Sequence, residues 1–389
     1  MSKRIVCWAA LFIVIAVVLA APPVLSQSNP PRSARSATAY VNWAQLGFDA
    51  CHNGYNPNEF ILGPSNVGNL TVAWTFQASG SINSTLAVAN GILYAASVDQ
   101  YLYALNARTG ALVWKFQISG ADYPTPVVVN GVVYVGGGNY LYALRATDGK
   151  LLWNYTGSRY VYLPTVVDAV VYFGASDGLY AVQADTGMLL WKSADNIWTG
   201  YTAVANGIVY VSSQFGQLYA FNADTGALLW ISDKYPGALP VVANGILYLG
   251  TEGSSYGPGV IALRADTGAF LWNFQTVDAV FNSPAVAYGT VYLQSSDSYL
   301  YALNAQTGQL QWAYYNAPST YISPVVANGV VYTVSFAWGS NDGMQAVNAL
   351  TGQLLWQDKS LFGSTIVANG WMYATDDNLS VYAFHLPGH

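Results

Sequence analysis

The stretch LAVANGILYAASVDQYLYALNARTGALVWKF, residues 86–116, contains the pattern that decides the fold of this 389-residue chain. Its first two apolar segments are joined by Asn90-Gly91, the strongest short-range signal for a β-hairpin, because both residues tolerate positive φ. Its last two apolar segments, 101–105 and 112–116, are joined by a turn that ends in Thr109-Gly110. The stretch therefore predicts four short antiparallel strands, called A to D below.

The same unit recurs along most of the chain, and a tryptophan marks strand D each time. These tryptophans lie 38 to 44 residues apart, at Trp74, Trp114, Trp153, Trp191, Trp230, Trp272, Trp312 and Trp356. The Asn-Gly turn between strands A and B also recurs, and units three and six replace it with Asp168-Ala169 and Tyr288-Gly289. A period of about 40 residues suits the four-stranded blade of a β-propeller.

The two ends of the repeated region complement each other. Residues 364–384 supply strands A, B and C but no strand D, whereas residues 70–76 have the strand D pattern with nothing before it. Pairing residues 70–76 with the last strand C would remove the free edges of the ring. We therefore predict one all-β domain over residues 41–389, an eight-bladed propeller with its tryptophans wedged between neighbouring blades.

Composition supports this fold class and limits the partners. Only 8% of the residues are charged and 15% are aromatic, and Glu59 and Glu252 are the only glutamates, so we expect almost no helix in the folded part. Beyond residue 40 the chain has all 19 acidic residues and nine of the basic ones, a formal charge of about −10. Nucleic acid and anionic lipid surfaces are therefore excluded as partners. We expect a monomer.

The N-terminal segment predicts export. Lys3 and Arg4 precede an unbroken apolar run over residues 5–21, followed by two prolines and small residues. Residues 1–26 therefore read either as a signal peptide or as an uncleaved N-terminal anchor, which would be the sole contact with a membrane. Residues 27–40 form a flexible spacer. In both cases the propeller would lie outside the cell or in the cell envelope.

Sequence variation is concentrated on one face of the predicted disc. The A to B and C to D turns share one face, and the longer B to C and D to A loops share the other. Aromatic residues in these loops predict a rim around the central channel, formed by Tyr123, Trp198, Tyr256, Phe281, Tyr321, Trp338 and Phe362. Such a rim would stack on a flat ligand, a sugar or an extended peptide, or else its rings merely cover the ends of the cores between blades.

Other polar residues give weaker signals. Glu252, Asn341 and Asp342 are oxygen donors on the loop face, of the kind that calcium prefers. Turn formation explains the recurring loop aspartates Asp99, Asp177 and Asp297. For Arg145 and Arg264 we expect contacts with a neighbouring blade, and for His52 a structural role with its hydrogen bonds satisfied. Common phosphate-loop, serine-hydrolase and zinc-hydrolase motifs are missing.

Seven segments, from Ala104–Trp114 to Ala346–Trp356, resemble the tryptophan-docking repeat of the pyrroloquinoline quinone (PQQ) propeller superfamily. That resemblance implies either a quinoprotein dehydrogenase or a non-catalytic propeller such as the scaffold lipoprotein of the outer-membrane β-barrel assembly machinery. The dehydrogenases hold PQQ against two adjacent cysteines and a calcium or lanthanide ion. In this chain Cys7 and Cys51 are not adjacent, so no catalytic, cofactor or metal residue is assigned.

These observations lead to a primary and an alternative function. The primary prediction is an exported, non-enzymatic scaffold that binds protein or glycan at the cell surface through its loop-rich face and needs no cofactor. The alternative is a minimal quinoprotein dehydrogenase that uses PQQ with Ca²⁺ to oxidise an alcohol or a sugar.

Overall fold

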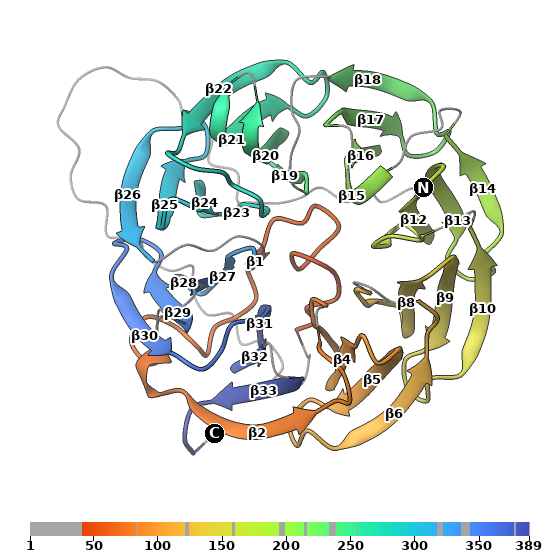
Figure 1. Cartoon of the computed structure of the whole chain (residues 1–389), viewed down its shortest axis with the longest axis horizontal. Coiled ribbons are helices and arrows are strands. Elements are labelled where there is room, and N and C mark those ends of the chain that lie inside the picture. The colour runs from red at the N-terminus through yellow and green to blue at the C-terminus, as the bar shows by residue number, and fades with distance from the viewer. Residues whose placement is uncertain are drawn as a thin grey trace, which may run out of the picture.

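A computed structural model of the chain describes residues 41–82, 84–120, 124–157, 160–193, 199–213, 216–232, 239–254, 256–316, 322–335, 343–376 and 379–388. In this part the strands form eight antiparallel sheets around a central channel, and the only helical element is the 3-10 turn η1 (Val67–Asn69) (Figure 1). None of the described helical structure has the length and apolar character needed to cross a membrane. The predicted leader, 1–26, and spacer, 27–40, lie outside the described residues.

Each of the first four blades has strands A to D in chain order from the channel outward. Blade 1 comprises β3 (Ala87–Ala89), β4 (Ile92–Ala96), β5 (Tyr101–Asn106) and β6 (Leu112–Gln117). Blade 2 comprises β7 (Val127–Val129), β8 (Val132–Gly137), β9 (Tyr140–Arg145) and β10 (Leu151–Thr156). Blade 3 comprises β11 (Thr165–Val167), β12 (Val170–Ala175), β13 (Gly178–Gln183) and β14 (Leu189–Lys192). Blade 4 comprises β15 (Thr199–Ala205), β16 (Ile208–Ser213), β17 (Leu218–Asn222) and β18 (Leu228–Ser232).

The remaining blades continue this order until the ring closes. Blade 5 comprises β19 (Val241–Ala243), β20 (Ile246–Ser254), β21 (Gly257–Arg264) and β22 (Phe270–Gln275). Blade 6 comprises β23 (Ala285–Ala287), β24 (Thr290–Gln294), β25 (Tyr299–Asn304) and β26 (Leu310–Tyr315). Blade 7 comprises β27 (Val325–Ala327), β28 (Val330–Ser335), β29 (Gly343–Asn348) and β30 (Leu354–Asp358), with the short parallel strand β1 (Tyr55–Asn56) added to β27. Blade 8 comprises β31 (Thr365–Ala368), β32 (Trp371–Thr375), β33 (Ser380–His385) and β2 (Thr71–Gln77).

The N-terminal strand closes the ring as predicted. β2 pairs antiparallel with β33, so that Trp74 lies opposite Ala383 and Phe76 opposite Val381. Blade 8 therefore takes three strands from one end of the chain and its outer strand from the other. The prediction of eight blades is confirmed.

Seven of the eight strand D tryptophans, all except Trp356, pack on the C to D turn glycine of the next blade, and Trp114 shows the contact. Its indole N–H donates to the carbonyl oxygen of Ala146 in blade 2 at 2.9 Å, and the hydroxyl of Tyr94 donates to the same oxygen at 3.0 Å. Equivalent indole bonds run from Trp74 to Ala107, Trp153 to Ala184, Trp191 to Ala223, Trp272 to Ala305 and Trp312 to Ala349. The buried indole N–H of Trp230 has no hydrogen-bond partner among the described residues. One carbonyl oxygen of a blade thus accepts hydrogen bonds from two aromatic side chains of the preceding blade, as at Ala146.

A glycine in the C to D turn makes room for the indole. At Gly149, an added Cβ would lie 2.6 Å from Cε3 of Trp114, and φ is +70°. Both conditions favour glycine, because an L residue is strained at this φ and its side chain would displace the ring.

The contact between blades 7 and 8 differs, because blade 8 has no C to D turn. The hydroxyl of Tyr332 is buried there without a hydrogen-bond partner among the described residues, and Trp356 packs edge-on against Phe384 at 5.6 Å between ring centroids. Residues 59–70 fill the junction instead, with the buried carboxylate of Glu59 accepting the N–H groups of Leu62 at 3.0 Å and Gly370 at 3.0 Å. Lead-in residues therefore replace the missing docking turn.

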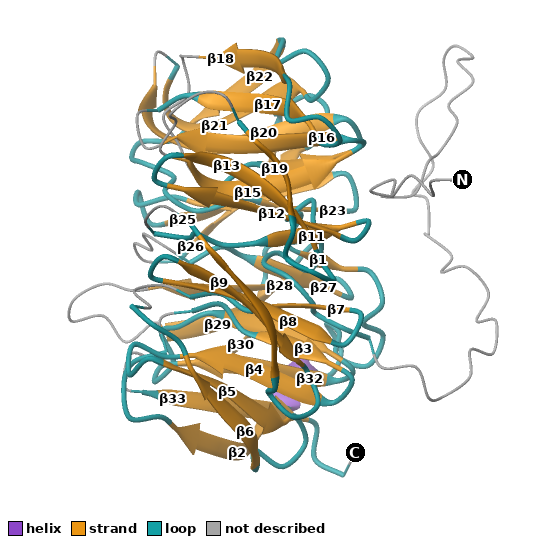
Figure 2. Cartoon of the chain, turned by 90° about the vertical axis from the view of Figure 1, so that its right-hand side faces the viewer, coloured by secondary structure: helices purple, strands orange, loops and turns teal. Residues whose placement is uncertain are grey.

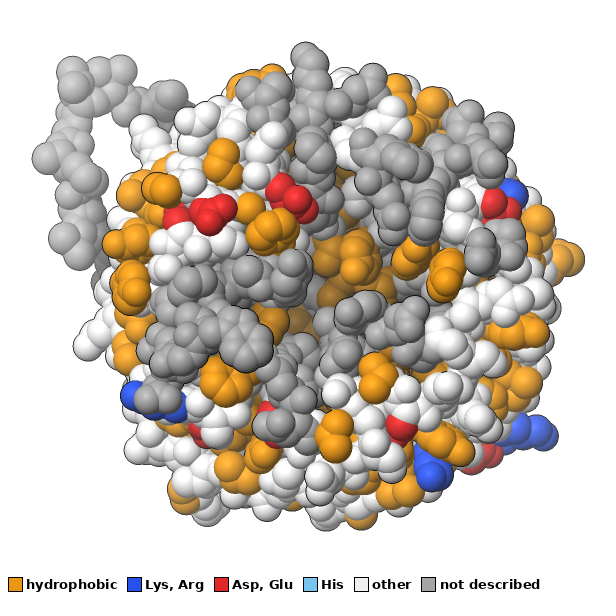
Figure 3. Space-filling model, viewed as in Figure 1, with side chains coloured by type: hydrophobic (Ala, Val, Ile, Leu, Met, Phe, Trp, Pro, Cys, Tyr) orange, Lys and Arg blue, Asp and Glu red, His pale blue; other side chains and the backbone are white. Residues whose placement is uncertain are grey.

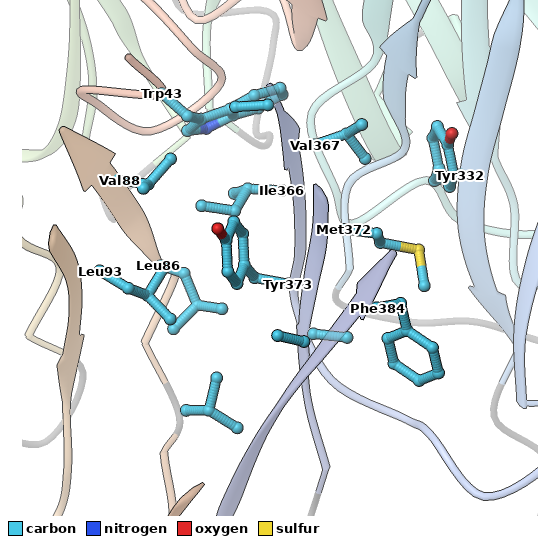
Figure 4. Packing of buried hydrophobic residues seen from close by; sticks show 14 of the residues in the cluster. Trp43, Leu86, Val88, Leu93, Tyr332, Ile366, Val367, Met372, Tyr373 and Phe384 are labelled. Carbon is cyan, nitrogen blue, oxygen red and sulfur yellow. The ribbon is translucent and has the colours of Figure 1, made fainter. Parts of the chain in front are cut away.

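The core at blade 8 joins both neighbours and the lead-in. Figure 4 shows Tyr373 of β32 facing Leu86 of blade 1, while Met372 points toward Phe384 on the side of blade 7. Trp43 of the lead-in lies over Val88 in the same cluster and is 1% exposed. The lead-in is thus part of the hydrophobic core.

We predict that the indole contact, more than the turn conformation, determines the cost of substituting a turn glycine. Gly226 and Gly207 both have positive φ, +70° and +78°, but an added Cβ meets Trp191 at 2.6 Å only at Gly226, and nothing within 4 Å at Gly207. Gly226→Ala should reduce the free energy of unfolding by about 1–3 kcal/mol more than Gly207→Ala, because it overpacks the contact. Urea denaturation of both variants measures this, and equal losses would contradict the role given to the indole.

Candidate functional site

The lead-in segment 43–56, called the plug below, crosses the central channel and contacts every blade in turn (Figure 1). Its carbonyl oxygens accept the N–H of a valine in the innermost strand of six blades. The pairs are Trp43 with Val88, Ala44 with Val128, Ala50 with Val204, Cys51 with Val242, Asn53 with Val286 and Gly54 with Val326, at 2.7 to 2.9 Å.

Side chains of the plug serve the other two blades. The amide of Gln45 accepts the N–H of Val166 at 2.9 Å, and the amide of Asn56 donates to the carbonyl of Val367 at 2.8 Å. Each valine lies just before an A to B turn, so the plug occupies the channel near the turn face. It supplies partners to inner strand edges that would otherwise be unpaired. Figure 3, which views the loop face, shows the hollow that remains at the centre.

Each blade has one residue at the loop-face end of its innermost strand, called the wall position below, six positions before the second residue of the A to B turn. In blade order these residues are Thr85, Thr125, Leu163, Tyr201, Leu239, Ser283, Ser323 and Ser364. Hydrogen bonds link neighbouring blades at this level: Ser283 N–H donates to Oγ of Ser323 at 3.1 Å, and Oγ of Ser283 donates to the carbonyl of Leu239 at 3.3 Å.

The wall positions fall into two groups, one with hydroxyl side chains and one with mainly apolar side chains. Blades 6, 7, 8, 1 and 2 present hydroxyls, called the hydroxyl arc, at Ser283, Ser323, Ser364, Thr85 and Thr125. Blades 3, 4 and 5 present the apolar arc, Leu163, Tyr201 and Leu239. Because consecutive blades share each type, the two arcs face each other across the channel.

Two titratable groups of the plug have shifted pKa values. The carboxylate of Asp49 accepts the N–H of Cys51 at 3.0 Å and the amide of Asn53 at 3.0 Å, yet burial raises its pKa to about 6. His52 is 3% exposed, with Nε2 at 3.4 Å from Oγ1 of Thr165. Its Nδ1 is buried and has no hydrogen-bond partner in the part of the chain that the structure describes. Burial lowers the pKa of His52 to about 4, so the ring is neutral and only partly satisfied, contrary to our expectation.

Only three of the predicted rim aromatics lie among the described residues. Tyr256 stacks on Phe270 at 4.9 Å between ring centroids and packs against the core between blades 4 and 5. Phe281 and Phe362 are half-buried, and Phe362 packs against the core at blade 8. The other four, Tyr123, Trp198, Tyr321 and Trp338, lie outside the described residues, as do Asn341 and Asp342.

The loop aspartates form turns, as predicted. Asp99 accepts the N–H of Tyr101 at 3.0 Å and the hydroxyl of Tyr103 at 2.6 Å. Asp297 repeats this pattern with Tyr301 at 2.9 Å, and Asp177 accepts from Tyr180 at 2.9 Å. These carboxylates are therefore occupied by their own blades. In the described part of the chain, no group of three metal-ligating side chains comes together, and Glu252 is exposed.

The expectation for the two motif arginines is wrong. Arg145 pairs with Asp148 at 2.9 Å and Arg264 with Asp266 at 2.7 Å, each within its own C to D turn and exposed on the turn face. Other blades have an amide residue here, such as Asn106, whose Oδ1 accepts the N–H of Arg108 at 3.0 Å. The side chain at this position therefore stabilises the C to D turn. An arginine side chain cannot accept a backbone N–H as the amide does, so it pairs with an aspartate of the turn instead.

The plug is the part of the site that sequence reasoning missed. Its residues were identified only as a lead-in, and they have no periodicity because each contact lies in a different blade. Gly47 and Gly54 give local signals, since their φ values are +62° and +68°, and an added Cβ would lie 2.7 Å from the carbonyl oxygen of His52 and 2.8 Å from Cβ of Ala285.

Comparison with known proteins identifies relatives of this fold. A family model described as outer membrane protein assembly factor BamB matches residues 69–194 and 175–386. None of the curated proteins matches the chain in sequence.

Solved structures share the architecture. The quinohemoprotein alcohol dehydrogenase ADHIIG from Pseudomonas putida superposes with a TM-score of 0.71 and 16% identity, covering 90% of this chain and 81% of that one. BamB from Moraxella catarrhalis gives a TM-score of 0.65 and 18% identity, covering 82% and 98%. A europium-containing methanol dehydrogenase gives 0.70 and 14%, covering 89% and 98%. At these identities the likeness shows the fold alone.

We predict that Asp49 and His52 give stability opposite dependences on pH. The folded pKa of Asp49, about 6, exceeds its ordinary value of 3.8, so its contribution is fully present below pH 3.8 and is lost as the pH rises to 6. The folded pKa of His52, about 4, is below its ordinary 6.5, so its contribution grows as the pH rises from 4 to 6.5. Asp49→Asn should therefore leave a stability that rises over this window, by on the order of 2 kcal/mol.

His52→Gln should have the converse effect, a stability that falls between pH 4 and 6, because only the Asp49 dependence remains. Urea denaturation at several pH values measures both variants. Parallel pH profiles for the two would show that these groups are not buried as described.

Proposed function

This chain belongs to the family of PQQ-like β-propellers whose model is described as outer membrane protein assembly factor BamB, and on that premise we propose that it is an exported, non-enzymatic scaffold that binds a protein partner through its loop face. Lys3, Arg4 and the apolar run after them support export to the cell envelope. Of the two partner classes left open by the sequence, the description of the family favours protein.

The observation that carries the proposal is the difference between the two faces. The turn face is nearly uniform: its A to B turns have positive φ in every blade, and its C to D turns bond to themselves, as from Gly110 N–H to the carbonyl of Asn106 at 2.9 Å. The loop face bears the variable elements, including the long hairpin β20–β21 of blade 5. Variable loops on a rigid support are the usual place for recognition.

The start of the described chain indicates how the loop face would be oriented relative to a membrane. Val41 and Asn369 exchange hydrogen bonds at 2.7 Å, and the amide of Asn42 accepts the N–H of Asn90 at 3.0 Å. Both partners belong to A to B turns, so the described chain begins at the turn face. An uncleaved leader that acts as an anchor would therefore attach at the turn face. Figure 2, an edge-on view, shows the loop face on the opposite side of the disc. The loop face would then be directed away from the membrane and toward a partner.

PQQ does not fit the wall of the channel. The eight wall residues offer hydroxyl, aliphatic and phenol groups, whereas a polycarboxylate quinone needs cationic partners. The exposed Arg145 and Arg264 are paired on the opposite face. Calcium would also need several oxygen ligands, and the loop carboxylates of Asp99 and Asp297 are occupied by tyrosines.

We predict that photo-crosslinking will distinguish the two faces. A photoreactive phenylalanine analogue at Phe281 or Phe362 should give a discrete protein adduct in cells, because both lie on the loop face. Tyr288 is the matched control, an aromatic residue 54% exposed in an A to B turn of the turn face. Adducts that form only at position 288 would assign the partner to the turn face.

We also predict that PQQ added with Ca²⁺ produces neither a saturable change in visible absorbance nor substrate-dependent dye reduction with alcohols or sugars. The reason is the lack of fit between the wall and the cofactor. Saturable binding together with dye reduction would instead support the dehydrogenase alternative.

A further inference from the structure

We propose that the part of the turn face formed by blades 6 to 8 lies against a bilayer of zwitterionic lipid. This patch, called the apolar sector below, comprises Phe60, Ile61, Tyr288 and Leu350. The proposal rests on the part of the proposed function in which the leader is kept as an anchor, and it is independent of the partner at the loop face. It adds a second membrane contact to the anchor.

The C to D turns of blades 6 and 7 differ from the other five in charge. Each C to D turn of blades 1 to 5 contains at least one charged residue, whereas residues 304–309 and 348–353 contain none. Leu350 is 85% exposed and occupies the position that Asp185 and Asp224 occupy in their own turns. Because the same turn forms with an aspartate, turn formation does not explain the leucine.

The A to B turn of blade 6 departs from its neighbours in the same way. Six blades use Asn-Gly here, but blade 6 has Tyr288, whose side chain is 54% exposed and whose φ is +53°. Positive φ is unfavourable for a bulky residue, and asparagine or glycine adopts it at a lower cost. Turn formation therefore does not explain the tyrosine either.

Tyr288 and Leu350 belong to one continuous surface. The hydroxyl of Tyr288 accepts the N–H of Gly329, in the A to B turn of blade 7, at 3.1 Å. The carbonyl of Gly329 in turn accepts the N–H of Ala349, the residue before Leu350, at 2.9 Å. The two exposed apolar side chains are thus linked through the turns of neighbouring blades.

Phe60 and Ile61 extend this surface to blade 8. They are 70% and 47% exposed, and they precede Leu62, whose carbonyl accepts the amide of Asn328 in the turn of blade 7 at 2.9 Å. Ile61 also lies against the turn of blade 8, since a Cβ added at Gly370 would be 2.9 Å from its Cγ2. Three adjoining blades therefore share an exposed apolar surface, and such surfaces mark contacts with a partner or a membrane.

The apolar sector has no exposed charge among its described residues. Within 57–70 the one charged side chain is Glu59, which is 2% exposed and accepts the N–H groups of Ile61 and Gly370. The A to B turns of blades 6 to 8 and residues 385–388 contain no Asp, Glu, Lys or Arg. Contact with lipid at this surface therefore removes no charged side chain from water. The formal charge of about −10 beyond residue 40 selects zwitterionic over anionic lipid.

The start of the described chain favours a bilayer as the occupant. Val41 exchanges hydrogen bonds with Asn369 in the A to B turn of blade 8, the turn that Ile61 also contacts. Residues 1–40 therefore join the domain beside the apolar sector, and their apolar run, 5–21, is long enough to reach across a bilayer. An anchor inserted there brings lipid to the sector at a high local concentration, so a few apolar side chains suffice for contact.

The test uses the full chain, synthesised in the presence of phosphatidylcholine vesicles so that residues 1–40 are retained. A photoreactive phenylalanine analogue at position 60 should form lipid adducts on irradiation, detected by mass spectrometry. The same analogue in place of Val277, which is 88% exposed in a D to A loop of the loop face, should form about tenfold fewer, because that face is directed away from the lipid.

A charge in the apolar sector should weaken the contact. Leu350→Asp should lower the yield of lipid adducts at position 60 about fivefold or more, because the carboxylate would lose hydration at the bilayer. The variant is expected to fold, since Asp185 and Asp224 fill this position in their own turns. Val277→Asp is the matched control, which adds the same charge at a similarly exposed side chain of the loop face and should leave the yield unchanged. Thermal melting checks that both variants fold.

Equal yields of lipid adducts at positions 60 and 277, or a yield at position 60 that Leu350→Asp does not lower, would overturn the proposal. So would adducts from position 60 to a second copy of the chain or, in cells, to another protein. A full chain that does not associate with the vesicles would overturn both the anchor and the sector contact. Cross-linking from Phe281 on the loop face is read separately, so the protein partner of the proposed function stands or fails independently.

Discussion

The structure depends on one contact, which forms at every blade junction except that between blades 7 and 8: the indole of a strand D tryptophan packs against the C to D turn of the next blade. In this contact the ring lies on a turn glycine, and its N–H shares an alanine carbonyl oxygen with a tyrosine hydroxyl of the same blade, as Trp114 and Tyr94 do at Ala146. A single oxygen with two lone pairs satisfies both buried donors. Because the contact repeats from blade to blade, it sets the spacing between sheets whose two faces are both apolar.

A ring built in this way leaves unpaired backbone groups in two places, at the outer edge of blade 8 and along the innermost strands. Segments near the N-terminus supply hydrogen-bond partners at both places. β2 supplies the outer strand of blade 8, and the plug supplies acceptors to the innermost strands. As a consequence, polar groups of the plug are buried in the channel. Burial raises the pKa of Asp49 and lowers the pKa of His52. Where blade 8 lacks a docking turn, the buried carboxylate of Glu59 joins the lead-in to the backbone of Gly370.

The arrangement separates support from recognition. The turn face is held by repeated, internally bonded turns, and the plug covers the channel beside it. The loop face keeps the central hollow and the variable loops, which is why the proposed function places a protein partner there. The wall, however, changes from hydroxyl to apolar between one half of the ring and the other, although the scaffold behind it repeats.

The sequence by itself determined the number of blades, their order and the closing strand, because tryptophan spacing and Asn-Gly turns report local hairpins that need no distant contact. It also predicted the turn-forming role of Asp99 and Asp297, which bond within their own loops. Only the tertiary structure decided that Arg145 turns back to Asp148, that Tyr256 stacks on Phe270, and that residues 43–56 fill the channel. Each of these depends on which groups meet in space, and in the plug every partner lies in a different blade, so no periodic pattern could show it.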